Sequence, residues 1–267
     1  MIACKIVGAA LLVLLPAAQG WACTKTVRWF DDAPYSFQDK DGNIVGVDAD
    51  LARAALRLSG CRANFVQMPW ARALIELERG KLDVLPGAFR SPEREHFAHF
   101  SMPLPQSANV LYLSAAASKK YQPATLEELA GTPFRLGVQI GVAYGDSFKR
   151  FKTRPGAHVN LVPITLRCNG WKMIELGRID GMIADEASAA AELKQLQLDN
   201  VVLPSRVTVS TDTAMFAFSK ATSEPDFVAR FNKALASLTD NGQYRKLRER
   251  YLRHGALQNA CMAQPAG

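Results

Sequence analysis

Predicted strands and predicted helices alternate along most of this chain, and no other feature of the sequence restricts its fold as strongly. Residues 26–30, 64–68 and 83–85 have the composition of strands, and residues 48–58 and 71–79 have apolar side chains at helical spacing. Strand–helix–strand units of this kind form parallel sheets with right-handed connections and helices on their faces. The sequence therefore predicts an α/β protein.

A second series of the same kind follows, so the chain divides into two similar halves. Its strands and helices are predicted, in order, at residues 109–114, 134–138, 145–151, 159–162, 169–176, 181–184 and 187–196. A strand at 214–219 and two helices complete the chain. Pro103, Pro105 and the polar pair Gln106-Ser107 precede the second series, as expected where a chain passes from one lobe to another.

We expect two lobes, each a mostly parallel sheet flanked by helices, joined by a hinge of two crossing segments. Residues 24–106 and 211–255 would form lobe 1, residues 107–210 lobe 2, and residues 256–267 a tail. The length of 267 residues fits two lobes, since single cores seldom grow past ~250–300 residues. The carboxyl ends of the strands would border a shared crevice, where open α/β sheets bind ligands.

Residues 1–22 have the pattern of a secretory signal peptide. Lys5 is followed by a run at 6–18 that is almost wholly apolar, and small residues follow at Gly20 and Ala22. The run is shorter than the ~20 residues that span a bilayer. We expect cleavage after Gly20 or Ala22 and export to the periplasm; a lipid anchor on Cys23 is the alternative, which the bulky Trp21 disfavours.

Four cysteines remain after cleavage: Cys23, Cys61, Cys168 and Cys261. An oxidising compartment favours disulfides over metal ligation, and four cysteines allow three pairings. Cys23 precedes the first strand and Cys61 precedes the second, and these strands should be neighbours in a parallel sheet. We therefore prefer Cys23–Cys61, which leaves Cys168–Cys261, and we expect neither a metal nor a cofactor.

The net charge of the chain excludes few classes of function. The formal net charge is +7, with basic residues scattered and no run longer than Lys119-Lys120. A nucleic-acid-binding arm is therefore not indicated. A mild positive excess fits an anionic ligand and plain solubility equally well.

Seven short motifs occur in an order that resembles a known family. They include Ala33-Pro-Tyr-Ser-Phe37, Gly46-Val-Asp-Ala-Asp50, Ser91-Pro-Glu-Arg94, Gly177-Arg-Ile-Asp-Gly181 and Asn241-Gly-Gln-Tyr244. The chain resembles the extracellular solute-binding proteins of family 3, the periplasmic partners of polar amino-acid ABC transporters. This resemblance implies the type II periplasmic-binding fold, a small carboxylate-bearing solute, an ABC permease as partner and no catalysis. We also expect a monomer.

The resemblance assigns two charged residues to the ligand. Arg94 follows the strand at 83–85, and the family arginine of this motif holds the carboxylate of the solute. A guanidinium suits that role, because it donates two charge-assisted hydrogen bonds from a rigid fork. Asp185 follows the strand at 181–184 and resembles the aspartate that receives an ammonium. The alternatives are a structural salt bridge for Arg94 and a helix cap for Asp185.

Other candidates surround the predicted crevice. Trp70 resembles the aromatic wall of the family, although a core tryptophan is the alternative. Asp31, Asp32 and Tyr35 leave the first strand at its carboxyl end, and either aspartate could receive an ammonium or simply form a turn. Further candidates are the backbone amides of Gly141 and Val142.

Three departures weaken an α-amino-acid assignment. Phe89 stands where a hydroxyl residue usually binds the ligand carboxylate, and Val142 also lacks a hydroxyl. Arg72 and Arg90 are extra cations near Trp70 and Arg94, unless both are solvated. A diacid or an aromatic acid is therefore a second possible ligand.

Two other functions are compatible with the sequence. A cleft enzyme of the cyclohexadienyl dehydratase type would need a general acid, for which Asp31, Asp32, Glu93 and Asp185 are the candidates. A periplasmic sensing or accessory module is the other.

Overall fold

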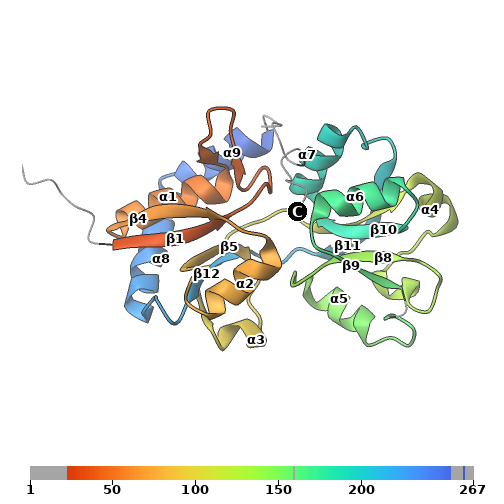
Figure 1. The fold of residues 1–267 in the computed structure, drawn as a ribbon, viewed down its shortest axis with the longest axis horizontal. Helices are drawn as coiled ribbons and strands as arrows, with labels where there is room; N and C mark the ends of the chain where they lie inside the picture. Colours follow the sequence, from red (N-terminus) through yellow and green to blue (C-terminus); the bar gives the residue numbers. More distant parts are fainter. Residues whose placement is uncertain (1–22, 159, 254–260, 262–267) are drawn as a thin grey trace, which may run out of the picture.

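The structure is a computed structural model that describes residues 23–158, 160–253 and 261. The expected signal peptide lies outside the described residues, and so does most of the expected tail. Two five-stranded sheets, each with helices on its faces, lie side by side in Figure 1.

The first sheet has the strand order β4-β1-β5-β12-β6. Its strands are β1 (Cys23–Trp29), β4 (Cys61–Gln67), β5 (Val84–Ala88), β6 (Ala98–Phe100) and β12 (Met215–Ser219). β1 pairs in parallel with β4 and β5, whereas β12 is antiparallel to β5 and β6. Four of the five strands therefore run in one direction. Flanking helices are α1 (Val47–Leu58), α2 (Trp70–Glu78), α3 (Pro92–Glu95), α8 (Pro225–Asp240) and α9 (Gln243–Arg253).

The second sheet repeats this plan in the order β11-β7-β10-β8-β9. Its strands are β7 (Asn109–Ser114), β8 (Leu136–Gln139), β9 (Leu161–Ile164), β10 (Gly181–Asp185) and β11 (Val202–Ser210). Only β7 runs against the other four strands. Flanking helices are α4 (Ala115–Lys120), α5 (Gly145–Lys152), α6 (Arg167–Glu175) and α7 (Glu186–Leu196), with a 3₁₀ turn η1 at Leu126–Leu129.

Each sheet has its own apolar core. In the first half, Leu51 and Leu56 of α1 and Phe231 of α8 are fully buried against the sheet. In the second, Trp171 of α6 is fully buried, and Leu111 of β7 lies in a further cluster. Burial of large apolar side chains, each worth roughly 1.5–3 kcal/mol, fixes these helices on their sheets. The small hairpin β2 (Phe37–Gln38) and β3 (Ile44–Val45) precedes α1.

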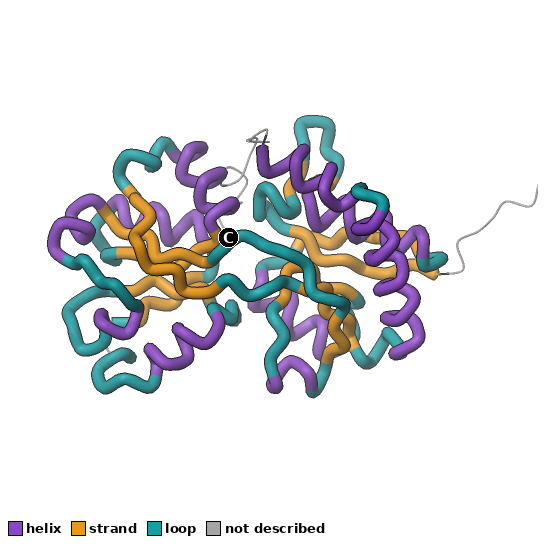
Figure 2. Tube along the Cα trace, turned by 180° about the vertical axis from the view of Figure 1, so that it is seen from behind, coloured by secondary structure: helices purple, strands orange, loops and turns teal. Residues whose placement is uncertain are grey.

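The chain passes between the halves twice, after β6 and after β11 (Figure 2). The two passages are hydrogen-bonded to each other, since the amide of Leu104 donates to Ala214 at 2.8 Å and the amide of Ala214 donates back at 3.1 Å. β7 and β12, the antiparallel strands, are the first strands after each passage. The predicted two-lobed α/β fold is confirmed; the lobe boundaries 24–106 with 211–255, and 107–210, remain a prediction.

Both predicted disulfides are present. Cys23 and Cys61 lie opposite each other on β1 and β4, with their Cα atoms 4.5 Å apart. Cys168 in α6 is bonded to Cys261, which follows the last residue of α9 by eight positions. α9 packs on α1 and α8 of the first half. The second disulfide therefore joins the C-terminal part of the chain to the other half.

Removal of the Cys23–Cys61 bond should lower the free energy of unfolding. The bond closes a loop with a sequence separation of 38, for which the loss of chain entropy in the unfolded state predicts about 2–4 kcal/mol. Urea denaturation of the double variant Cys23→Ser/Cys61→Ser measures this loss. An unchanged free energy at an unchanged m-value would contradict it.

Candidate ligand-binding site

A cavity that opens to solvent lies where the two halves meet. Both sheets contribute to it, from the ends of β1 and β5 on one side and of β8 and β10 on the other. Its polar and charged lining residues are Arg28, Asp32, Tyr35, Ser36, Asp48, Arg94, Gln106, Asn109, Gln139, Tyr144, Arg167, Asp185 and Ser188. Trp70, Phe89 and Val142 are among its apolar lining residues.

Asp32 links the two halves through a pair of arginines. It forms an ion pair with Arg28 of β1, and Arg167 of α6 approaches its other oxygen at 3.3 Å. Burial raises the pKa of Asp32, but the two guanidinium groups outweigh this and hold its pKa below the usual value. Asp32 is therefore ionised and already paired.

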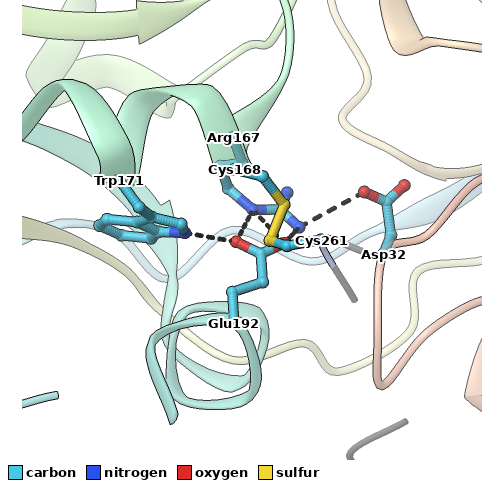
Figure 3. Close-up of a disulfide and its surroundings, with 6 residues drawn as sticks. All are labelled: Asp32, Arg167, Cys168, Trp171, Glu192 and Cys261. Carbon is cyan, nitrogen blue, oxygen red and sulfur yellow. Dashed lines mark hydrogen bonds and ion pairs between the residues drawn. A yellow bond between two sulfur atoms is a disulfide. The ribbon is translucent and has the colours of Figure 1, made fainter. Parts of the chain in front are cut away.

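Arg167 has a second and stronger partner in Glu192 of α7. The Nε of Arg167 lies 3.1 and 3.0 Å from the two carboxylate oxygens of Glu192, which is only 1% exposed. The indole nitrogen of Trp171 donates to the same carboxylate at 2.6 Å. Figure 3 shows Arg167 between Glu192 and Asp32, with the Cys168–Cys261 disulfide beside them.

Asp185 stands at the end of β10 and caps α7. One carboxylate oxygen accepts from the amide of Ser188 at 2.9 Å, so the predicted capping role is present. The other oxygen accepts from the hydroxyl groups of Ser107 at 2.7 Å and Tyr35 at 3.2 Å. Among the described residues, no basic side chain forms an ion pair with this buried carboxylate. The side chain of Asp185 therefore has two hydroxyl donors and one amide donor, but no basic partner, at the edge of the cavity.

Arg94 is buried at the cavity wall. The N-cap Ser91 accepts the amide of Arg94 and so begins the short helix α3. The guanidinium donates to the carbonyl of Phe89 at 2.6 Å and, across the halves, to that of Gly141 at 2.8 Å. Burial lowers its pKa, although the arginine stays charged. Three of its five N–H groups have no acceptor among the described residues.

Trp70 is the first residue of α2 and lines the cavity beside Arg94. Its indole nitrogen donates to the carbonyl of Gly141 at 3.0 Å. The guanidinium carbons of Arg28 and Arg94 lie 5.6 and 5.8 Å from the centre of its ring. These cation–π contacts fix both arginines relative to the ring.

Asp48 lies at the start of α1 because the preceding glycine allows a close approach. Gly46 has a φ of 126°, and a Cβ there would lie 2.4 Å from the carbonyl oxygen of Tyr35. That oxygen accepts the amides of Asp48 and Ala49. The carboxylate of Asp48 reaches the cavity, and no described residue donates a hydrogen bond to it or forms an ion pair with it.

The environment of Asp48 disfavours its charged form. Burial and the negative charges of Asp185 and Asp32 raise its pKa to about 7, against the smaller opposing effects of Arg28 and Arg248. It is therefore the cavity carboxyl whose ionisation falls near neutral pH.

Arg72, Arg90 and Asp31 do not line the cavity. Arg72 follows Trp70 by two positions on α2, and two residues turn a helix by about 200°, so its side chain is 70% exposed and pairs with Glu76. Arg90 is 61% exposed beside Glu95. Asp31 lines a smaller neighbouring cavity, and burial and Asp32 raise its pKa. The extra cations that favoured a diacid are thus absent from the cavity.

The backbone at 141–142 differs from the expectation. Gly141 presents its carbonyl, not its amide, to Arg94 and Trp70, and the amide of Val142 donates to Gln139 at 3.2 Å. A role of these two amides in ligand binding therefore gains no support from the geometry.

Most of the polar lining residues were not predicted as site residues, among them Arg28, Asp48, Gln106 and Arg167. The sequence does contain a signal for Arg28, because a charged residue between the apolar Val27 and Trp29 of a strand marks a candidate site residue. No local sequence pattern marks Arg167, because its acidic partners lie 25 and 135 positions away along the chain.

The fold is that of a two-lobed α/β protein with a cavity where its two halves meet. Residues 29–254 match the bacterial extracellular solute-binding proteins, family 3, and the chain belongs to that family. It is a solute-binding protein, of the class that captures a small solute for an ABC permease.

Individual relatives agree with this class. The arginine-binding extracellular protein ArtP of Bacillus subtilis (strain 168) is 27% identical over 229 residues, which cover 83% of this chain and 82% of ArtP. The structure of an ancestral arginine-binding protein bound to arginine is 26% identical with a TM-score of 0.73, covering 87% of this chain and 99% of that one. An ancestral amino-acid-binding protein, a precursor of cyclohexadienyl dehydratase, is 25% identical with a TM-score of 0.69, covering 86% and 95%.

The described part of the chain holds no group of three or more His, Cys, Asp or Glu side chains placed to bind a metal ion. None of its helices combines the length and the apolar character needed to cross a membrane.

The stability of the ligand-free protein should fall as the pH rises from about 4 to the pKa of Asp48 at about 7. Folding raises this pKa from 3.8 to about 7, so the contribution is complete below about pH 4 and is lost as the pH passes about 7. The slope due to Asp48 is at most about 1.4 kcal/mol per pH unit. Urea denaturation across this range should give a flatter profile for Asp48→Asn. A profile parallel to that of the wild type would contradict the assignment.

Proposed function

We propose that this solute-binding protein captures an α-amino acid between its lobes, with Arg94 on the carboxylate and Asp185 on the ammonium. The observation that carries the proposal is that two buried, oppositely charged groups face one cavity from different halves, and neither has a charged partner among the described residues. A buried charge without a partner is costly, so a zwitterion that supplies both partners would bind favourably.

The geometry of Arg94 supports the carboxylate role. Its two side-chain hydrogen bonds go to main-chain carbonyls, which leaves further N–H groups for a ligand. The carbonyls and Trp70 hold the guanidinium in place before binding, so little side-chain entropy is lost when a carboxylate arrives. Phe89 then contributes its carbonyl to positioning Arg94 rather than a hydroxyl to the ligand.

Asp185 supports the ammonium role in a similar way. Ser107 and Tyr35 hold one carboxylate oxygen, and Ser188 holds the other, so the group is oriented toward the cavity. Ser107 belongs to the first passage between the halves, which ties the orientation of Asp185 to the hinge.

Closure of the lobes would complete the site. In the present structure the halves touch through Arg167 and Asp32, and through Gly141, which accepts from both Arg94 and Trp70. We propose that lobe 1 (24–106 and 211–255) and lobe 2 (107–210) rotate about the two passages. Closure would exclude water and present the loaded form to the permease.

The family and the signal-peptide pattern of residues 1–22 support an exported protein. We propose that residues 1–22 are cleaved on export, that the mature protein is periplasmic, and that it acts as a monomer.

A cleft enzyme is the second candidate, because Asp48 is a carboxyl with a pKa near 7 inside the cavity and would suit a general acid. A spectroscopic assay with prephenate and arogenate should detect no turnover. Turnover that disappears in Asp48→Asn would replace the binding proposal.

A thermal-shift screen of L-amino acids, dicarboxylates and aromatic acids, followed by calorimetry, tests the main proposal. At least one amino acid should raise the melting temperature, because it binds only the folded state. Arg94→Ala should weaken binding of that amino acid by about 100-fold or more, since it removes the partner of a desolvated carboxylate. Arg57→Ala, which removes an exposed charge from α1, should bind normally. Unchanged affinity in Arg94→Ala would refute the role of Arg94.

A further inference from the structure

We infer that Asp48 and Gln106 form a subsite for a cationic group at the end of the ligand's side chain, so that the solute is a basic amino acid. The inference rests on the proposed function, since it concerns the part of an amino acid that Arg94 and Asp185 leave unbound. It depends on two acceptors in the cavity that the described residues leave unsatisfied.

The first acceptor is the carboxylate of Asp48. Other anions of the cavity have partners: Asp32 has Arg28 and Arg167, and Asp185 has three hydrogen-bond donors. Asp48 has no donor to its side chain among the described residues. A carboxylate held in this way attracts a cation more strongly than a solvated one, because the site has a low dielectric constant.

The second acceptor is the side-chain oxygen of Gln106. This atom is buried and lacks a hydrogen-bond partner. Leaving a buried acceptor unsatisfied costs about 1–3 kcal/mol, so a ligand donor that reaches it gains affinity. Gln106 lies in the first passage between the halves, directly before Ser107, which bonds to Asp185.

A side chamber begins between these two residues. A second, much smaller cavity shares Tyr35, Asp48, Gly87 and Gln106 with the main cavity. Its other walls are mostly apolar: Leu104, Pro105, Ala214, Met215, Phe216 and Tyr244. Apolar walls suit the methylene groups of a long side chain, and the two acceptors suit a terminal group with several N–H donors.

Ionised Asp48 would be required for this pairing. The charged and ionisable groups around it are Arg28, Asp32, Tyr35, Asp185, Tyr244 and Arg248. Because burial and the negative charges of Asp185 and Asp32 raise the pKa of Asp48 to about 7, affinity for a cationic ligand should increase as the pH rises through neutrality.

Calorimetry with L-arginine and L-citrulline tests the subsite, because citrulline has the shape of arginine but a neutral end group. The wild type should bind arginine about 100-fold more tightly than citrulline. Asp48→Asn should abolish most of this preference by lowering the affinity for arginine. Gln106→Met should lower the affinity for arginine by about tenfold without raising the affinity for citrulline. Asp41→Asn, which removes an exposed carboxylate in a turn, should keep the preference. Melting curves establish that each variant is folded.

The pH dependence gives a second readout. Arginine affinity should rise between about pH 6 and about pH 8 in the wild type and stay flat in Asp48→Asn. Citrulline binding as tight as arginine binding in the wild type, or an arginine preference that survives in Asp48→Asn, would overturn the inference while amino-acid capture stands. Failure of every amino acid to bind would instead refute the proposed function.

Discussion

A charge removed from water must be paired, and this requirement organises the whole region where the two halves meet. Arg28, Asp32, Arg167 and Glu192 satisfy one another there, and their network includes an ion pair between the halves. Because these four charges pair with one another, none of them needs a charged partner from a ligand. Arg94, Asp48 and Asp185 are different, because each faces the cavity without a charged partner in the described structure. The ligand we propose supplies the three missing partners.

The fold makes this possible by bringing the ends of two similar sheets together. Each half has one antiparallel strand, β7 or β12, that receives the chain from the other half. The residues of the first passage then serve both structure and site, since Ser107 orients Asp185 and Gln106 contributes its free oxygen. Rotation about the passages would therefore move the two charge-binding walls relative to each other without disturbing either core.

Much of the fold could be predicted from the sequence, because strands and helices with clear apolar patterns are local features. The pairing of Cys23 with Cys61 followed from the same reasoning. Strand β11 was missed, since Pro204 and Arg206 interrupt its pattern and its pairing with β7 is irregular. Arg94 and Asp185 were predicted at the crevice from family motifs, and both line the cavity. Arg72 was misjudged because sequence proximity to Trp70 says nothing about the helix face. The role of Arg167 depends on partners distant in the chain, which no local pattern contains.

A crystal structure of the complex with the amino acid that binds most tightly tests the account most directly. The account predicts a carboxylate within hydrogen-bond distance of the Arg94 guanidinium and an ammonium at Asp185, with the side chain extending toward Asp48. A ligand whose carboxylate lies away from Arg94, or one bound outside the cavity between the lobes, would contradict it.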